Sequence, residues 1–386
     1  MRIGFIIQGS LDTLTGGYLY DRVVIQGLEK RGHEVEVISL PAGTYLRRLW
    51  FAFSQVLYRR LLAGKFDILI EDELCHPSLF LVNRRLRRHP DRPLLVALVH
   101  HLLCNEPRPR WQNMFFTVVE RTFLVSVDGF IHNSKTTQQT VVSLVGQSRP
   151  QVIAYPAGDR FGKPLSAEAI NKRTQRPGPL ELLYLGIVIP RKGLLPLLSA
   201  LAGVDRELWR LSIVGGLDFD PAYTARVQKL TRQLRLSASV RFLGPLQADD
   251  LTEILSSSHL FCMPYAYEGF GIAILEAMAF GLPAIGCRSG AACESISHGT
   301  NGFLLDPGDR EGLEPLLLQL HRDRERLQQM ALAACATSVS RPSWQDTIAV
   351  IDTFLRTLKE LPILRKGVGP TLNQGTSGLR DSDATE

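Results

Sequence analysis

Short runs of apolar residues alternate with longer amphipathic stretches along most of the chain. Five runs lie in the first half, at residues 2–7, 33–40, 66–71, 93–100 and 127–134, and five in the second, at 180–186, 210–216, 239–245, 259–265 and 283–287. Nearly continuous hydrophobicity is typical of parallel strands buried on both faces, and the stretches between them have helical periodicity. The pattern therefore predicts an α/β protein with two doubly wound, Rossmann-like domains.

The alternation is interrupted by a polar stretch with proline and glycine, FGKPLSAEAINKRTQRPGP, at residues 161–179. We therefore expect a first domain at residues 1–165, a second at 166–340 and a C-terminal helix at 341–365. Residues 366–386 contain almost no apolar side chains, and we expect them to be disordered. Two doubly wound domains that meet at a linker form a cleft at the carboxyl ends of both sheets, where such sheets bind ligands.

The composition is that of an ordinary globular protein, with 45% hydrophobic and 21% charged residues. No apolar run reaches the roughly 20 residues that a membrane-spanning helix needs, and the opening MRIGFIIQGS resembles a strand and not a signal peptide. The six cysteines form no Cys-x-x-Cys pair and are expected to be reduced thiols. These features predict a cytoplasmic protein.

Positive charge is concentrated in the first half of the chain. Residues 41–121 contain 13 Lys/Arg and 7 Asp/Glu, a surplus of six that equals the formal net charge of the whole chain. One basic cluster, NRRLRRHPDRP, lies at residues 83–93. A local basic surface predicts an anionic partner, such as membrane lipid or a phosphorylated substrate.

A second feature of this region is the segment 44–65, which is rich in aromatic residues and arginine. Its spacing predicts one helix whose core face carries Leu46, Leu49, Trp50, Phe53, Leu57 and Leu61. Another apolar stripe, near Arg47, Arg48 and Arg59, carries Phe51, Tyr58 and Leu62. Two interpretations remain open: a helix buried on two faces with solvated arginines, or an interfacial helix that attaches the protein to a membrane.

The stretch EGFGIAILEAMAFGLPAIG at residues 268–286 places two carboxylates, Glu268 and Glu276, eight residues apart. Glycines on both sides of Phe270 let the backbone approach a ligand, and good helix formers begin at Ile272. A helix that starts there presents free backbone N–H groups, which form an anion-binding site. The two carboxylates could accept hydrogen bonds from hydroxyl groups of one ligand; the alternative is that Glu276 is an ordinary surface residue of the helix.

This stretch resembles the E-x7-E signature of glycosyltransferase family 4, the retaining family of GT-B fold that is also known as glycosyl transferases group 1. Six further segments resemble the family in the same order along nearly the whole chain. They are GG at 16–17, LVHHL at 98–102, IHNSKTT at 131–137, LYLGIVIPRKGLLPLLSAL at 183–201, GAACESISHGTNGFLLDPGD at 290–309 and WQDTIAVIDTFLRTL at 344–358. The last resembles the C-terminal helix that crosses back onto the first domain.

The resemblance implies a nucleotide-sugar donor and assigns roles to the second domain. Lys192 is expected to neutralise the charge of the departing diphosphate, an electrostatic role that often dominates catalysis. Glu276 is expected to bind the ribose hydroxyls and Glu268 the hydroxyls of the transferred sugar. The backbone amides expected to hold the sugar and phosphates are those of Phe270, Gly271 and Ile272.

The resemblance also implies roles in the first domain and one departure. Gly16 and Gly17 are expected to let their loop reach the diphosphate, and His100 to position the donor sugar near its anomeric carbon, while His101 is expected to be structural. Many family members have an arginine where this chain has Ile187, and Arg191 is the candidate replacement. No side chain stands out as a nucleophile, so a same-face displacement with retention of configuration is implied.

We expect no cofactor and no metal, because the Asp218-x-Asp220 sequence lies away from the donor motifs. The expected partners are a nucleotide-sugar donor, a sugar, polyprenyl-linked or lipid acceptor and an anionic membrane surface, which would place the protein at the inner face of the cytoplasmic membrane. No motif for nucleic-acid recognition is present. Two alternatives share the architecture: a sugar-nucleotide epimerase and a non-catalytic nucleotide-sugar-binding protein.

Overall fold

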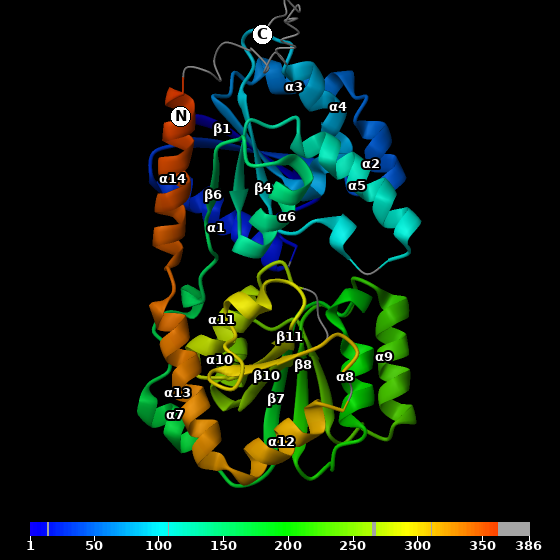
Figure 1. Ribbon diagram of the computed structural model, residues 1–386, viewed down its shortest axis with the longest axis vertical. Coiled ribbons are helices and arrows are strands. Elements are labelled where there is room, and N and C mark those ends of the chain that lie inside the picture. The colour runs from blue at the N-terminus through cyan, green and yellow to red at the C-terminus, as the bar shows by residue number, and fades with distance from the viewer. Residues whose placement is uncertain (14, 107, 265–267, 310, 362–386) are drawn as a thin grey trace, which may run out of the picture.

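The computed structural model describes residues 1–361 except 14, 107, 265–267 and 310, so the expected disordered tail at 366–386 lies outside the described residues. Two α/β domains are stacked along the long axis of the molecule (Figure 1). Each contains a six-stranded sheet in which all neighbouring strands are parallel. The predicted pair of doubly wound sheets is therefore confirmed.

The first sheet has the strand order β2-β1-β3-β4-β5-β6. Its strands are β1 (Arg2–Gln8), β2 (Glu34–Leu40), β3 (Ile68–Asp72), β4 (Leu94–Val99), β5 (Gly129–His132) and β6 (Gln151–Ile153). Its helices are α1 (Gly16–Lys30), α2 (Tyr45–Phe51), α3 (Gln55–Ala63), α4 (His76–Leu86), α5 (Arg110–Leu124) and α6 (Lys135–Val145). Apolar side chains pack on both faces of the sheet, which explains the nearly continuous apolar runs.

The second sheet has the order β12-β11-β10-β7-β8-β9. Its strands are β7 (Leu180–Leu185), β8 (Trp209–Val214), β9 (Val240–Gly244), β10 (Leu260–Met263), β11 (Ala284–Cys287) and β12 (Gly302–Leu305). Its helices are α7 (Ala167–Thr174), α8 (Leu194–Leu201), α9 (Pro221–Gln233), α10 (Ala248–Ser257), α11 (Ile272–Ala279), α12 (Leu313–Arg322) and α13 (Arg324–Ser340). The sequence did not predict β6 or β12, which are short strands at the edges of the two sheets.

The last described helix, α14 (Trp344–Glu360), lies along the first domain although it follows the second in sequence (Figure 1). It begins with a capping box between Ser343 and Asp346. Its buried face contributes Ile351, Leu355 and Leu358 to the same core cluster as β1 and α1. The chain therefore passes between the domains twice, once after β6 and once before α14.

The segment 44–65 departs from its prediction, because it forms two helices and not one. α2 ends at Phe51, and the Ser54 hydroxyl accepts a hydrogen bond from the amide of Leu57 to begin α3. The predicted core face is buried at Leu57 and Leu61, but wrong at Leu46, Trp50 and Phe53, which are 68%, 78% and 64% exposed. Phe51, Tyr58 and Leu62, the second stripe, pack partly buried against the core, as the interpretation of a segment buried on two faces expects for them. Because the chain breaks at residues 52–54, α2 and α3 pack on the domain with other faces than one continuous helix would use.

None of the helices described here combines the length and the apolar character needed to cross a bilayer.

Candidate active site

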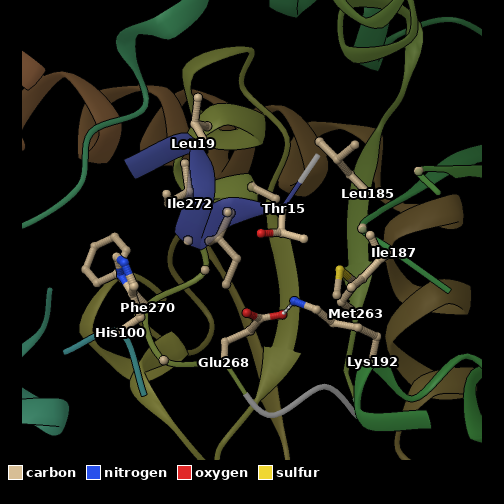
Figure 2. A pocket seen from close by; sticks show the side chains of 18 of the residues that line it. Thr15, Leu19, His100, Leu185, Ile187, Lys192, Met263, Glu268, Phe270 and Ile272 are labelled. Atoms are coloured by element: carbon tan, nitrogen blue, oxygen red, sulfur yellow. Dashed lines mark hydrogen bonds and ion pairs between the residues drawn. The ribbon is translucent and has the colours of Figure 1, made fainter. Parts of the chain in front are cut away.

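A cavity of about 830 Å³ lies between the two domains, at the carboxyl ends of both sheets. Figure 2 shows side chains from both domains converging on it, with Lys192 and Glu268 joined at its centre. All the residues that the sequence assigned to the site line this one cavity: Gly16, Gly17, His100, Arg191, Lys192, Glu268, Phe270, Gly271, Ile272 and Glu276. The fold thus brings together residues that are up to 260 positions apart in the sequence.

The amino end of α11 forms one wall of the pocket. Gly271 precedes the helix with φ of 86°, a left-handed conformation that favours glycine. The helix that follows leaves its first backbone N–H groups without intrahelical partners, and these groups attract anions. Glu268 lies just before this turn, where its carbonyl oxygen accepts a hydrogen bond from the amide of Ala291 at 2.9 Å.

Lys192 and Glu268 form a largely buried ion pair inside the pocket. Burial acts to raise the pKa of Glu268, but the charges of Lys192 and Arg191 outweigh it and hold that pKa below its usual value. Burial also lowers the pKa of Lys192, an effect that Glu268 opposes. The pair places a carboxylate and an ammonium group next to each other in the pocket.

Glu276 is buried on α11, with its carboxylate Oε1 2.7 Å from Nε of Arg160. Burial raises the pKa of Glu276, while the guanidinium group of Arg160 opposes that shift. Glu276 is therefore not an ordinary surface residue of its helix, which was the alternative interpretation. Arg160, which the sequence analysis missed, lies in the segment that joins the domains, and no periodicity or spacing distinguishes it.

Arg191 reaches across the cleft toward the first domain. Its Nε lies 3.6 Å from Oε1 of Glu106, and the same oxygen contacts Nε2 of His101 at 3.0 Å. The second oxygen of Glu106 accepts a hydrogen bond from Arg108 at 2.5 Å. Arg191 and Ile187 both line the pocket. The sequence analysis did not identify Glu106 or Arg108.

His100 follows β4 and has a buried carboxylate as its partner. Its Nε2 lies 3.0 Å from Oδ1 of Asp21, a fully buried residue of α1. Burial acts to lower the pKa of His100, but Asp21 outweighs it and raises the pKa to about 9. The imidazole is therefore protonated near neutral pH, which suits a positioning group better than a general base. A side chain at Gly17 would begin 3.5 Å from the imidazole ring, so the glycine loop and His100 share one corner of the pocket.

The two domains touch closely beside the pocket. A Cβ atom at Gly269 would overlap the carbonyl oxygen of His100 and lie 3.0 Å from Cβ of His101. The hydroxyl of Ser134 donates a hydrogen bond to the carbonyl oxygen of Gly269 at 2.9 Å. At the amino end of α6, the carboxylate of Glu294 accepts hydrogen bonds from the amide of Thr136 at 2.7 Å and from that of Lys135 at 3.1 Å. These contacts join the two domains beside the pocket, an arrangement that we call closed.

Two groups of residues have side chains of the types that bind metals, and the first is the Asp218-x-Asp220 sequence. Asp220 caps α9 by accepting a hydrogen bond from the amide of Tyr223 at 2.9 Å, and neither it nor Asp218 lines the pocket.

Among the described residues, Glu73, His76 and Glu120 offer ligand atoms within 4.8 Å of one another, all buried. The ring nitrogens of His76 contact the carbonyl oxygen of Glu73 and the hydroxyl of Tyr45, each at 2.9 Å. Glu120 accepts hydrogen bonds from two backbone amides of the loop after His100–His101. The group therefore forms a network that supports this loop.

Comparison with known sequences gives a consistent result. Residues 166–335 match the profile of the family described as Glycosyl transferases group 1. The chain is 24% identical to the D-inositol 3-phosphate glycosyltransferase of Nocardia farcinica, over 91% of this chain and 87% of that protein. It is 29% identical to the GDP-mannose-dependent alpha-(1-6)-phosphatidylinositol monomannoside mannosyltransferase of Mycobacterium tuberculosis, over 51% of this chain and 53% of that protein.

Comparison with solved structures identifies the same architecture. Sucrose-phosphate synthase from Thermosynechococcus elongatus is similar with a TM-score of 0.79 and 18% identity, over 93% of this chain and 99% of that one. Anabaena Alr3699/HepE, solved in complex with UDP-glucose, is similar with a TM-score of 0.74 and 20% identity, over 94% and 100%. At these identities the likeness establishes the fold alone. It confirms the predicted GT-B arrangement of two Rossmann-like domains that face a central cleft.

Proposed function

The chain contains a glycosyl transferases group 1 domain at residues 166–335, and from this premise we propose that it moves a sugar from a nucleotide-sugar donor to an acceptor hydroxyl with retention of configuration. The observation that carries the proposal is the arrangement in the pocket. Lys192 and Glu268 form a largely buried pair beside the amino end of α11, and Glu276 is buried on the same helix. This combination suits a ligand that carries phosphates and several hydroxyl groups.

Each part of the donor has a matching group in the pocket. In this structure Lys192 is paired with the carboxylate of Glu268, and Arg191 with that of Glu106. The diphosphate of the donor is also negatively charged and suits the same two cations. The ribose hydroxyls suit Glu276, whose second carboxylate oxygen is not used by Arg160. The amides at the start of α11 suit the phosphates and the transferred sugar. No step requires a metal or an organic cofactor.

The proposed reaction is a displacement on one face of the sugar. The acceptor oxygen forms a bond to the anomeric carbon while the bond from that carbon to the diphosphate oxygen breaks. The proton of the acceptor hydroxyl passes to the departing phosphate, and Lys192 balances the charge that develops there. The three pocket carboxylates, Glu106, Glu268 and Glu276, are all in ion pairs, which favours this route over attack by a carboxylate on the sugar.

We propose that the acceptor is a lipid or a lipid-linked sugar at a membrane surface, because two exposed apolar stripes lie on the first domain. We call them together the apolar face: Leu46, Trp50, Phe53 and Val56 on the α2–α3 segment, and Trp111, Met114, Phe115 and Val118 on α5. These are eight of the twelve large apolar residues that are exposed in the described part of the chain. Soluble surfaces rarely gather such side chains, so an apolar environment is their natural partner.

The apolar face is connected to the pocket by aromatic contacts. α2 and α5 lie side by side on one flank of the first domain (Figure 1), with the Tyr45 ring 6.0 Å from that of Phe115 and 4.7 Å from that of Phe116. The guanidinium carbon of Arg108 lies 4.9 Å from the centre of the Phe116 ring. Arg108 in turn lines the pocket. An acceptor held at the face would therefore reach the pocket over a short distance.

The surface around the apolar face carries a larger excess of positive charge than the count of charged residues in the sequence indicates. Four of the seven acidic residues between positions 41 and 121 are buried: Glu71, Asp72, Glu73 and Glu120. Burial also raises their pKa values, to about 8 for Glu71 and Glu73 and about 7 for Asp72 and Glu120. The arginines of this region therefore dominate the surface charge, which complements an anionic membrane.

The function is tested by nucleotide release. We expect free nucleotide from one donor only when the protein is given UDP-, GDP- and ADP-sugars separately, with a higher rate when membrane lipid extract is added. The anomeric configuration of the product, measured by NMR, is expected to match that of the donor. An inverted product would exclude the same-face reaction. Conversion of the donor sugar without a glycosylated product would indicate the epimerase.

Membrane attachment is tested by flotation with liposomes. We expect the protein to float with vesicles that contain anionic lipid and to remain behind with neutral vesicles, because the arginines and the apolar face act together. Replacing Trp50 and Phe53 with serine is expected to abolish flotation, whereas replacing Phe219, an exposed aromatic residue of the second domain, is not. Equal flotation with neutral and anionic vesicles would contradict the electrostatic part of the proposal.

A further inference from the structure

A second cavity, of about 330 Å³, lies at the edge of the apolar face between the beginning of α3 and the end of α4. It is lined by Ala52, Phe53, Gln55, Leu81, Arg84, Arg85 and Arg88, and we call it the arginine groove. Three of its seven lining residues are arginines and none is acidic. It has no connection with the donor pocket, whose lining residues are all different.

One arginine of the groove is held in a fixed position. Arg85 donates a hydrogen bond from Nη2 to Oε1 of Gln55 at 2.5 Å, and its guanidinium carbon lies 4.2 Å from the centre of the Tyr58 ring. Gln55 belongs to α3 and Arg85 to α4, so this contact joins the two sides of the groove. A guanidinium group fixed in this way loses little conformational entropy when it binds an anion.

The other two arginines are free to bind. The side chains of Arg84 and Arg88 are exposed and form no ion pair or hydrogen bond within the part of the chain that the structure describes. Arg84 lies in the last turn of α4 and Arg88 two residues beyond its end, and both line the same groove. Clustered guanidinium groups without carboxylate partners are suited to phosphate, which they bind through paired N–H donors.

We propose that the arginine groove binds the phosphate of an anionic phospholipid head group while the apolar face enters the bilayer. Phe53 supports a membrane lipid over a soluble phosphate, because it lines the groove and also belongs to the apolar face. A phosphate held there lies at the boundary between polar and apolar surroundings, as it does in a bilayer. The inference rests on the membrane attachment proposed above and adds a specific lipid site to it.

The experiment compares two double variants that each remove two positive charges. In Arg84→Gln/Arg88→Gln the groove loses its free arginines; in Lys229→Gln/Arg232→Gln the same charge is removed from exposed positions of α9 in the second domain. Flotation is measured with phosphatidylcholine vesicles with and without phosphatidylglycerol. We expect the partition coefficient for the anionic vesicles to fall roughly tenfold or more for the groove variant, and to change within about twofold for the α9 variant.

Further measurements separate the possible failures. The melting temperature and the rate of nucleotide release without lipid are expected to be the same in the groove variant and the wild type, which shows that the fold and the donor site are intact. Equal flotation of the two double variants would overturn the lipid site. A melting temperature that inorganic phosphate raises only when Arg84 and Arg88 are present, with no difference in flotation, would assign the groove to a soluble phosphate and also overturn it. Absence of nucleotide release from the wild type would overturn the proposed function, and the flotation results would stand independently.

Discussion

Replacing Lys192 with alanine is expected to lower the turnover number by roughly a hundredfold to a thousandfold, the range found when one preorganised electrostatic stabiliser is removed. The Lys192 side chain is only 14% exposed in the pocket beside Glu268, where water screens its charge weakly. Its loss therefore removes stabilisation from the departing diphosphate in the transition state. Steady-state kinetics with the donor identified by nucleotide release measures the effect.

Three further variants accompany Lys192→Ala, and the first shows whether the loss comes from charge. Lys192→Met keeps most of the side-chain volume and is expected to be as slow as the alanine variant. Glu276→Gln is expected to raise the Kd for the donor by a larger factor than it lowers the turnover number, because the Glu276 carboxylate is assigned to the ribose. Lys229→Ala removes an exposed lysine of α9 and is expected to have wild-type kinetics. A wild-type turnover number in both Lys192 variants would refute the assignment of the diphosphate site.

Replacing Gly269 with alanine is expected to lower the turnover number by roughly a hundredfold, because misplacing reacting groups by about 1 Å can have an effect of that size. The added Cβ would overlap the carbonyl oxygen of His100, which belongs to the other domain. Because the overlap would be with a backbone oxygen and the Cβ is itself fixed to the backbone, no side-chain rotation can relieve it, and the domains must separate. Separation moves Lys192 and Glu268 away from His100 and from the Gly16–Gly17 loop.

This effect is expected to be confined to the arrangement of the domains. The melting temperature of Gly269→Ala should stay close to that of the wild type, and the free nucleotide should still bind, because the groups assigned to it lie mainly on the second domain. The matched control is Gly203→Ala, since a Cβ at that exposed position meets only an ordinary contact, 3.5 Å from the carbonyl oxygen of Ala200. Wild-type turnover in Gly269→Ala would show that the closed arrangement is not needed for catalysis.

The parts of the fold that depend on local pattern were predictable from the sequence. Ten strands of the described chain coincide with predicted apolar runs, whereas β6 and β12 were missed; β6 has only three residues and leaves little periodic signal, while β12 is no shorter than β5, β10 or β11. The helical spacing in segment 44–65 was real, but it gave the wrong buried side for α2, because it could not show the break before Ser54. Exposure of Trp50 depends on how α2 packs on its neighbours, which is a tertiary property.

In the candidate site, the residues that belong to short sequence motifs were predictable, whereas their partners from other parts of the chain were not. Glu268 and Glu276 lie in one short stretch whose glycines and helix formers already indicate a ligand. Their neighbours come from distant parts of the chain: Arg160 is 116 positions from Glu276, and Asp21 is 79 positions from His100. The buried charge of Asp21 has no local signature, because the partner that makes its burial favourable is supplied by the fold.

The position of α14 has a consequence for the order in which the protein folds during synthesis. Domains usually fold as they emerge, beginning with the N-terminal one. Here the core beside β1 and α1 needs Ile351, Leu355 and Leu358, which are made after the whole second domain. We therefore expect the later domain to become protease-resistant on the ribosome before the earlier one. A chain stalled before residue 344 would leave the apolar surface of α1 uncovered and available to chaperones.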